Sequence, residues 1–108
     1  MIKEVYIVYD SGVGGLTVLK EILEKNIKAN FVYIGDTKNA PYGNKTENQI
    51  KEFVRMNIEI IKLKYKINGI IMACNTAAII AKEYIETEMG IKVFPISEIS
   101  KRLSVDGK

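Results

Sequence analysis

Short runs of apolar and β-branched residues alternate along the chain with longer segments whose apolar positions repeat every three or four residues. The short runs predict four strands, at residues 4–9, 30–34, 70–73 and 92–96. The longer segments between them predict amphipathic helices. Strands that are apolar nearly throughout and that alternate with helices are typical of a parallel sheet covered by helices on both faces. The pattern therefore predicts an α/β fold.

The middle helix carries the clearest boundary signals. Thr46 and Gln49 have the spacing of a capping box, in which each side chain bonds the backbone of the other residue. The apolar stripe that follows keeps a period of 3.6 residues as far as Tyr65. Asn68-Gly69 is a plausible stop for this helix.

Glycines mark the other two helices. A turn rich in glycine, residues 10–15, precedes a first helix whose apolar face is expected to point inward. That face consists of Leu16, Val18, Leu19, Ile22 and Leu23. The last helix is expected over residues 76–88, ended by Gly90. Residues 37–45 hold Pro41 and Gly43 and predict a long loop.

The amino-acid composition limits which kinds of ligand and active site the chain can have. The 108 residues fit one small domain, and the net charge of +3 comes from basic residues interleaved with Glu, which disfavours nucleic-acid binding. A single cysteine excludes an internal disulfide and points to a reducing compartment. The absence of histidine excludes Ser-His-Asp triads and Cys-His dyads and removes the commonest zinc ligand. With no signal peptide and no membrane span in the sequence, we expect a cytoplasmic protein.

Polar residues interrupt the apolar pattern where the expected strands end. They are Asp10-Ser11, Asp36 and Cys74-Asn75-Thr76. Ligands of parallel α/β sheets bind beyond the carboxyl ends of the strands. We expect a flavodoxin-like strand order of 2-1-3-4, in which the first and third strands are neighbours, so their loops would face one crevice.

Two interpretations of the glycine-rich turn stand side by side. Its backbone can approach an anion at the start of the following helix, or it can simply allow tight packing. Position 17 is Thr, which breaks the G-x-G-x-x-G dinucleotide fingerprint, and no Gly-Lys-Ser/Thr ending of a P-loop follows. Nucleotide binding is therefore disfavoured.

Cys74 is the strongest candidate for chemistry. A lone cysteine usually serves as a small buried hydrophobe. Its place between a strand and a helix instead suits a thiolate, because a helix N-terminus stabilises negative charge. Asn75 and Thr76 are either helix caps or ligand-binding side chains. The backbone N–H groups of Tyr42 and Gly43 either belong to a surface connection or form an anion site.

Three ordered motifs resemble one family. Residues 9–18, YDSGVGGLTV, look like the opening of glutamate racemase, of the aspartate/glutamate racemase family. Residues 33–36, YIGD, with PYG at 41–43, are similar to its second block, and residues 73–77, ACNTA, resemble the block around its first catalytic cysteine. The resemblance extends from about Val5 to Ile96, and its motifs favour glutamate over aspartate or hydantoins as the substrate.

This resemblance implies an isomerase that interconverts L- and D-glutamate for peptidoglycan without a cofactor or a metal ion. In the family one cysteine removes the α-proton and a second returns a proton to the opposite face. Carried over by motif, Cys74 would be the thiolate that acts on the D-enantiomer. Asp10 would help to orient the thiol and, with Ser11, would contact the head of the amino acid.

The remaining substrate contacts implied by the resemblance lie in two segments. The backbone N–H groups of Tyr42 and Gly43 would hold a substrate carboxylate. Asn75 and Thr76 would bind the region of the α-carboxylate and the amine. The chemistry is consistent with these roles, since the α-proton is weakly acidic and its removal needs both a close base and stabilisation of negative charge.

The sequence departs from the family in length and in its second catalytic group. Members are well over twice as long, and their second half supplies a second domain and a Cys-Thr-His block. We therefore interpret residues 1–96 as an incomplete N-terminal α/β racemase domain and residues 97–108 as the start of a connection to a second domain. The expected partners are glutamate and either a second copy or a complementing C-terminal half, with no nucleic acid and no membrane. The isolated chain is expected to be inactive or half-active, and the alternative is a non-catalytic module that binds an amino acid or an anion.

Overall fold

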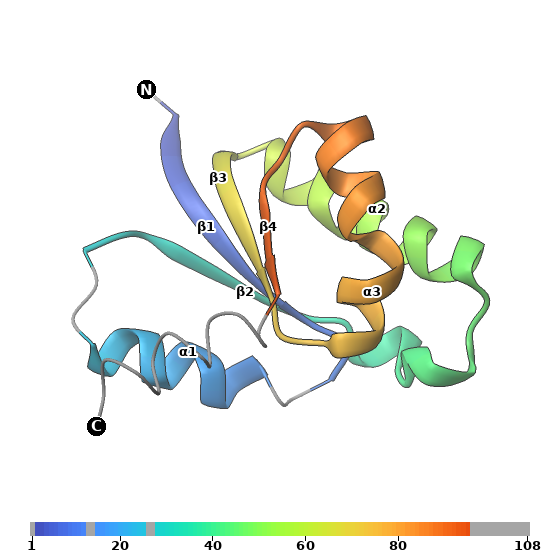
Figure 1. Cartoon of the computed structure of the whole chain (residues 1–108). Coiled ribbons are helices and arrows are strands. Elements are labelled where there is room, and N and C mark those ends of the chain that lie inside the picture. Colours follow the sequence, from blue (N-terminus) through green and yellow to red (C-terminus); the bar gives the residue numbers. More distant parts are fainter. Residues whose placement is uncertain (1, 13–14, 26–27, 96–108) are drawn as a thin grey trace.

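Four parallel strands form one sheet in the order β2-β1-β3-β4 (Figure 1). The strands are β1 (Lys3–Asp10), β2 (Phe31–Gly35), β3 (Tyr65–Met72) and β4 (Val93–Pro95). This computed structural model describes residues 2–12, 15–25 and 28–95. The predicted α/β class and the predicted strand order are both confirmed. The proposed boundary after residue 96 and the segment 97–108 lie outside the described residues.

Helices cover both faces of the sheet, as predicted. The helix α1 (Gly15–Glu24) lies on one face, and α2 (Glu47–Lys62) and α3 (Asn75–Tyr84) lie side by side on the other (Figure 1). A stretch of π-helix, η3 (Ile85–Met89), continues α3. Among the described residues, no helix has the length and apolarity needed to cross a membrane.

Two apolar clusters hold the helices to the sheet, one on each face. In β1, Ile7 and Tyr9 face the larger cluster beneath α2 and α3, whereas Val8 faces the smaller cluster beneath α1. This division follows from the alternation of side chains along a strand. The helix α2 contributes a fully buried face made by Ile50, Val54 and Ile58. Burial of each such side chain stabilises the fold by about 1.5–3 kcal/mol.

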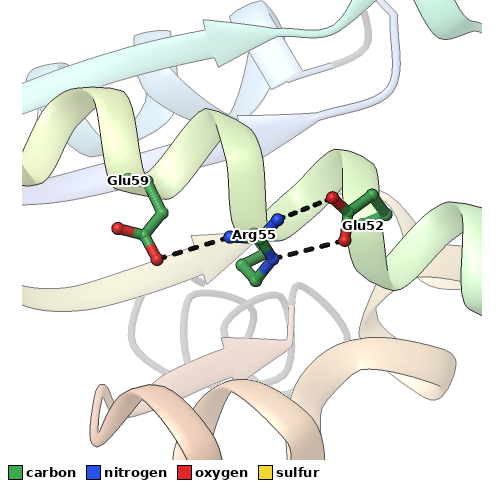
Figure 2. A network of polar contacts seen from close by, with 3 residues as sticks. All are labelled: Glu52, Arg55 and Glu59. Carbon is green, nitrogen blue, oxygen red and sulfur yellow. Dashed lines mark hydrogen bonds and ion pairs between the residues drawn. The ribbon is translucent and has the colours of Figure 1, made fainter.

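The exposed side of α2 carries ion pairs rather than packing contacts. The Arg55 guanidinium lies 2.6 Å from Glu52 and 3.6 Å from Glu59, along one side of the helix (Figure 2). Pairs that are this exposed contribute little to stability, about 0–1 kcal/mol. The position of α2 is therefore set by its buried face.

The boundary between α2 and β3 differs from the prediction. The helix ends at Lys62, and β3 starts at Tyr65, so Asn68-Gly69 lies inside the strand instead of ending the helix. The register with β1 shifts at this point, and Asn68 is the additional residue of the irregularity. Pairing with the neighbouring strand has overridden a local turn signal. Gly69 lets the Phe94 and Tyr6 rings pack close to the strand, because a Cβ would lie 2.9 Å from the Phe94 ring and 3.1 Å from the Tyr6 ring.

Helix ends and loops otherwise follow the sequence closely. The capping box of Thr46 is confirmed, and Gly90 ends the last helix in the left-handed conformation, at φ 68°. Residues 37–45 form two short 3₁₀ turns, η1 (Thr37–Asn39) and η2 (Tyr42–Asn44), with a cis bond before Pro41.

The inward face predicted for α1 is only partly correct. Ile22 is buried and Leu19 packs against the smaller cluster, but Leu23 is 60% exposed. In the described part of α1, Ile22 and Leu19 are the side chains that cover the smaller cluster, and Leu23 points outside it. The side chains of Leu16 and Val18 lie outside the described part of the structure.

Candidate functional site

Backbone hydrogen bonds join the carboxyl ends of the first three strands. The Asp36 N–H donates to the Asp10 carbonyl at 2.9 Å, and the Ala73 N–H donates to the Tyr9 carbonyl at 2.8 Å. The end of β1 is thus tied to the ends of both β2 and β3. The polar residues that follow these strands accordingly gather at one edge of the sheet, as the strand order predicts.

Cys74 lies between β3 and α3, at the N-cap position of the helix. Its backbone is extended, at φ −98° and ψ 115°, and its carbonyl accepts the first helical hydrogen bond, from the Ala78 N–H at 2.9 Å. The side chain is a free thiol, half-buried, and packs against the larger cluster. The side chain makes no capping hydrogen bond to α3, but the N-cap position lies at the positive end of the helix dipole, which favours an anion. The predicted location of the thiol is therefore confirmed.

Asp10 and Ser11 mark the end of β1 and the turn that follows. Asp10 is only 6% exposed, and its carboxylate accepts from the Gly12 N–H at 3.2 Å. The Tyr33 hydroxyl donates to the Gly12 carbonyl at 2.9 Å. Burial, with the negative charge of Asp10 adding to it, raises the pKa of Tyr33. The turn after β1 is thus held against β2, with Ser11 half-buried beside it.

Tyr42 and Gly43 begin the turn η2, and their exposures differ sharply. Tyr42 is 1% exposed, and its ring lies 5.8 Å from the Phe53 ring of α2. Gly43 is exposed, with no atom within 4 Å of where a Cβ would stand. The segment is therefore more than a surface connection, because its first side chain belongs to the core.

The Tyr42 hydroxyl belongs to a buried network that sequence reasoning missed. It donates to the Asp36 carboxylate at 2.5 Å and lies 2.6 Å from the Tyr9 hydroxyl. The Asn57 amide of α2 donates to Tyr9 at 2.9 Å, and the Asn39 amide donates to both Asp36 oxygens at 3.1 and 3.2 Å. The sequence places Asp36 at a strand end without indicating a role for it. Tyr9 and Asn57 gave no local signal, since they meet partners 33 and 48 residues away.

The two tyrosines of this network stay protonated near neutral pH. Burial raises the pKa of Tyr9 to about 12; hydrogen bonds with Tyr42 and Asn57 oppose the rise, and the negative charges of Asp36 and Cys74 add to it. Burial, followed by donation to Asp36, also raises the pKa of Tyr42 above its ordinary value. Both hydroxyls therefore act as hydrogen-bonding groups and not as bases.

Asn75 and Thr76 open α3 directly after Cys74. Asn75 is exposed and Thr76 is half-buried. An open groove of about 800 Å³ extends from Asn75 along α3 to Pro95 of β4. Of the predicted site residues, Asn75 lines this groove and Cys74 and Asp10 do not, so the groove begins beside the strand ends and runs away from the thiol along α3. Within the part of the chain that the structure describes, no set of three or more Cys, Asp or Glu side chains is arranged to hold a metal ion.

Comparison with known proteins points to one group. No protein-family model matches the chain. The chain is 40% identical over 106 residues to "Glutamate racemase 3" of Caldanaerobacter subterraneus subsp. tengcongensis. The aligned region covers 93% of this chain and 39% of that protein. It is 41% identical over 85 residues to a glutamate racemase of Leptospira interrogans, covering 79% of this chain and 33% of that protein.

Solved structures give the same result. The glutamate racemase from Aquifex pyrophilus superposes with a TM-score of 0.76 at 38% identity, over 85% of this chain and 36% of the other. The isoform RacE1 from Bacillus anthracis superposes with a TM-score of 0.77 at 35% identity, over 86% and 35%. The chain thus spans well under half of the length of these relatives. It is a relative of the glutamate racemases, and its coverage fits the N-terminal part of those longer proteins.

Proposed function

We propose that this chain supplies one of the two acid–base faces of a glutamate racemase that uses no cofactor. The observation that carries the proposal is the position of Cys74, a half-buried free thiol at the start of α3, at the same edge of the sheet as the Asp10 carboxylate. The relatives named glutamate racemase support glutamate as the substrate. The proposed setting is peptidoglycan synthesis in the cytoplasm.

The Cys74 thiolate acts as the base toward D-glutamate. It takes the α-proton, so that the C–H bond breaks and an S–H bond forms, and the electron pair stays on the α-carbon and its carboxylate. The start of α3 stabilises the thiolate before the transfer. Asp10 orients the thiol and, with Ser11, contacts the head of the amino acid.

Backbone and side-chain donors balance the charge that develops on the substrate. The N–H groups of Tyr42 and Gly43 hold a carboxylate, and Asn75 and Thr76 bind around the α-carboxylate and the amine. Donors that are already in place lower the barrier most where negative charge grows in the transition state. Inversion also needs a second group on the opposite face of the α-carbon, and the sequence holds one cysteine and no histidine.

The second group has to come from a partner. A complementing C-terminal half of a racemase fits this requirement. A second copy of the chain fits it poorly, because it would bring the same cysteine-bearing face. We therefore expect the chain alone to exchange the α-proton without inverting the carbon.

Deuterium uptake tests the proposal. In heavy water, the chain should slowly place deuterium at the α-carbon of D-glutamate, with negligible formation of the L-enantiomer, because Cys74 returns a solvent-exchanged proton to the same face. Proton NMR together with chiral chromatography measures both outcomes. Cys74→Ser should abolish the uptake, whereas Met56→Ser, at an exposed position of α2, should leave it unchanged.

Two results would count against the catalytic proposal. Robust conversion of one enantiomer to the other by the chain alone would show that no second half is needed. Exchange that survives Cys74→Ser would remove the thiol from the mechanism.

The second candidate function, a module that binds an amino acid or an anion, is favoured by the single cysteine of the sequence. It predicts thermal stabilisation by glutamate that Cys74→Ser leaves intact, with no exchange in either protein.

A further inference from the structure

Tyr42 is the point where a buried hydrogen-bond network meets an exposed part of the proposed site. Its ring and hydroxyl are in the core, and the next residue, Gly43, is exposed. The proposed function uses only backbone N–H groups of these two residues. The Tyr42 hydroxyl is therefore left without a role in that proposal, although it makes two short hydrogen bonds.

The hydrogen bonds of this network fit one assignment of donors and acceptors. A tyrosine hydroxyl has a single proton, and the Tyr42 proton goes to Asp36. Tyr9 must then donate to the Tyr42 oxygen, while its own oxygen accepts from the Asn57 amide. This chain of hydrogen bonds starts at Asn57 on α2 and ends at the Asp36 carboxylate. Its last bond is the strongest kind, because a charged acceptor strengthens a hydrogen bond.

Asp36 is itself fixed with respect to the candidate site. Its N–H donates to the Asp10 carbonyl, and its two carboxylate oxygens accept from the Asn39 amide. It is 7% exposed, so its charge is largely removed from water and depends on these donors. A residue held in this way can set the position of Tyr42 relative to the end of β1.

We propose that Asp36 is a positioning residue, which acts through the Tyr42 hydroxyl to hold the Tyr42 and Gly43 N–H groups where they receive a substrate carboxylate. The inference rests on the proposed function of those N–H groups. Asp36 itself contacts no substrate in this arrangement. The 3₁₀ turn η2 is only three residues long, and Tyr42 is its one buried residue, so the Tyr42 side chain is the part of the turn that is anchored in the core.

Three variants separate positioning from a general contribution to folding. Tyr42→Phe removes both the bond to Asp36 and the bond from Tyr9, and it keeps the buried ring. Asp36→Asn weakens the same bond from the other end, since an amide oxygen still accepts but carries no charge. Tyr9→Phe is the matched control, because it deletes a hydroxyl from the same network and leaves the bond from Tyr42 to Asp36 in place.

Two readouts are needed, one of them independent of any ligand. By ¹⁵N relaxation, the order parameter of the Gly43 N–H should fall below about 0.6 in Tyr42→Phe, fall less in Asp36→Asn, and keep its parent value in Tyr9→Phe. By calorimetry, the Kd of D-glutamate should rise about tenfold in Tyr42→Phe and stay within about twofold of the parent in Tyr9→Phe.

The outcomes distinguish this inference from the proposed function. An unchanged order parameter in Tyr42→Phe, or an equal loss of affinity in Tyr42→Phe and Tyr9→Phe, would overturn the positioning role. If the parent chain does not bind D-glutamate, the proposed function fails, and the relaxation measurement still decides whether Asp36 orders the turn.

Discussion

At the scale of single residues, the candidate site depends on close approach between neighbouring strand ends. Gly35, the last residue of β2, lies opposite Asp10 in the register of the sheet. A Cβ there would lie 2.8 Å from the Gly12 carbonyl oxygen and 2.9 Å from the Tyr33 hydroxyl. Real side chains do not come this close to backbone, so the turn after β1 keeps its position only with glycine at this point.

Gly35→Ala should consequently disturb the turn that carries Asp10 and Ser11. We expect a loss of about 1–3 kcal/mol in the free energy of unfolding, as for other overpacked sites. Urea denaturation measures the loss. Gly43→Ala is the matched control, because a Cβ there meets no atom within 4 Å, and it should change stability by less than about 0.5 kcal/mol. Equal effects of the two substitutions would contradict this account of Gly35.

At the scale of elements, the short strand β4 is the outermost described strand next to β3, and its outer edge presents no unpaired N–H donor. The Ile70 N–H donates to the Lys92 carbonyl, so the backbone of Val93 and of Pro95 points away from β3. The Val93 N–H donates to the Glu86 carboxylate at 2.9 Å, and Pro95 has no N–H. Along its three residues, β4 thus offers another strand no outward N–H that is still available.

Glu86 should therefore stabilise this edge in a way that depends on pH. Its bond from the Val93 N–H, helped by Lys82 at 3.1 Å, lowers the pKa of Glu86 below 4.5. A carboxyl group whose pKa is lower in the folded chain than in the unfolded chain gives its full stabilisation at any pH above its unfolded pKa. That stabilisation is lost as the pH falls through its folded pKa. We expect Glu86→Ala to lower the free energy of unfolding by about 1 kcal/mol at pH 7.

The pH dependence is the diagnostic part of this prediction. The difference between the parent chain and Glu86→Ala should narrow as the pH falls below 4.5, measured by urea denaturation over a pH series. Glu88→Ala, at an exposed position of the same π-helical stretch, should show no such dependence. A constant difference across the pH series would mean that the Glu86 carboxylate does not cap β4.

The elements also show where local signals are sufficient and where they fail. The capping box at Thr46 and the stop at Gly90 were predicted because each depends on residues within one helical turn. Asn68-Gly69 has equally good local turn chemistry but lies within β3. Its conformation follows from pairing with β1, more than sixty residues earlier in the chain, which no short window of sequence contains.

At the scale of the whole molecule, the chain presents one cysteine-bearing face and corresponds to 39% of the length of its Caldanaerobacter relative. Racemisation requires groups on two faces of the α-carbon. Mixing the chain with the remaining C-terminal part of that relative should therefore produce L-glutamate from D-glutamate, detected by chiral chromatography. The same mixture made with Cys74→Ser should be inactive. Activity of the C-terminal part alone, at the level of the mixture, would contradict a contribution from this chain.

The α/β class and the positions of Asp10, Ser11 and Cys74 at strand ends could be predicted from the sequence alone, because they follow from the periodicity of apolar residues and from rules for parallel sheets. The strand order was expected as one of the common orders of such sheets, and periodicity does not select it. The burial of Tyr42, its contacts with Tyr9 and Asp36, and the start of β3 at Tyr65 became visible only in the folded structure. These features depend on strand register and on side chains that converge from distant segments. Local propensity carries no information about either feature, because both are stabilised by packing and hydrogen bonds between segments that are distant in the sequence.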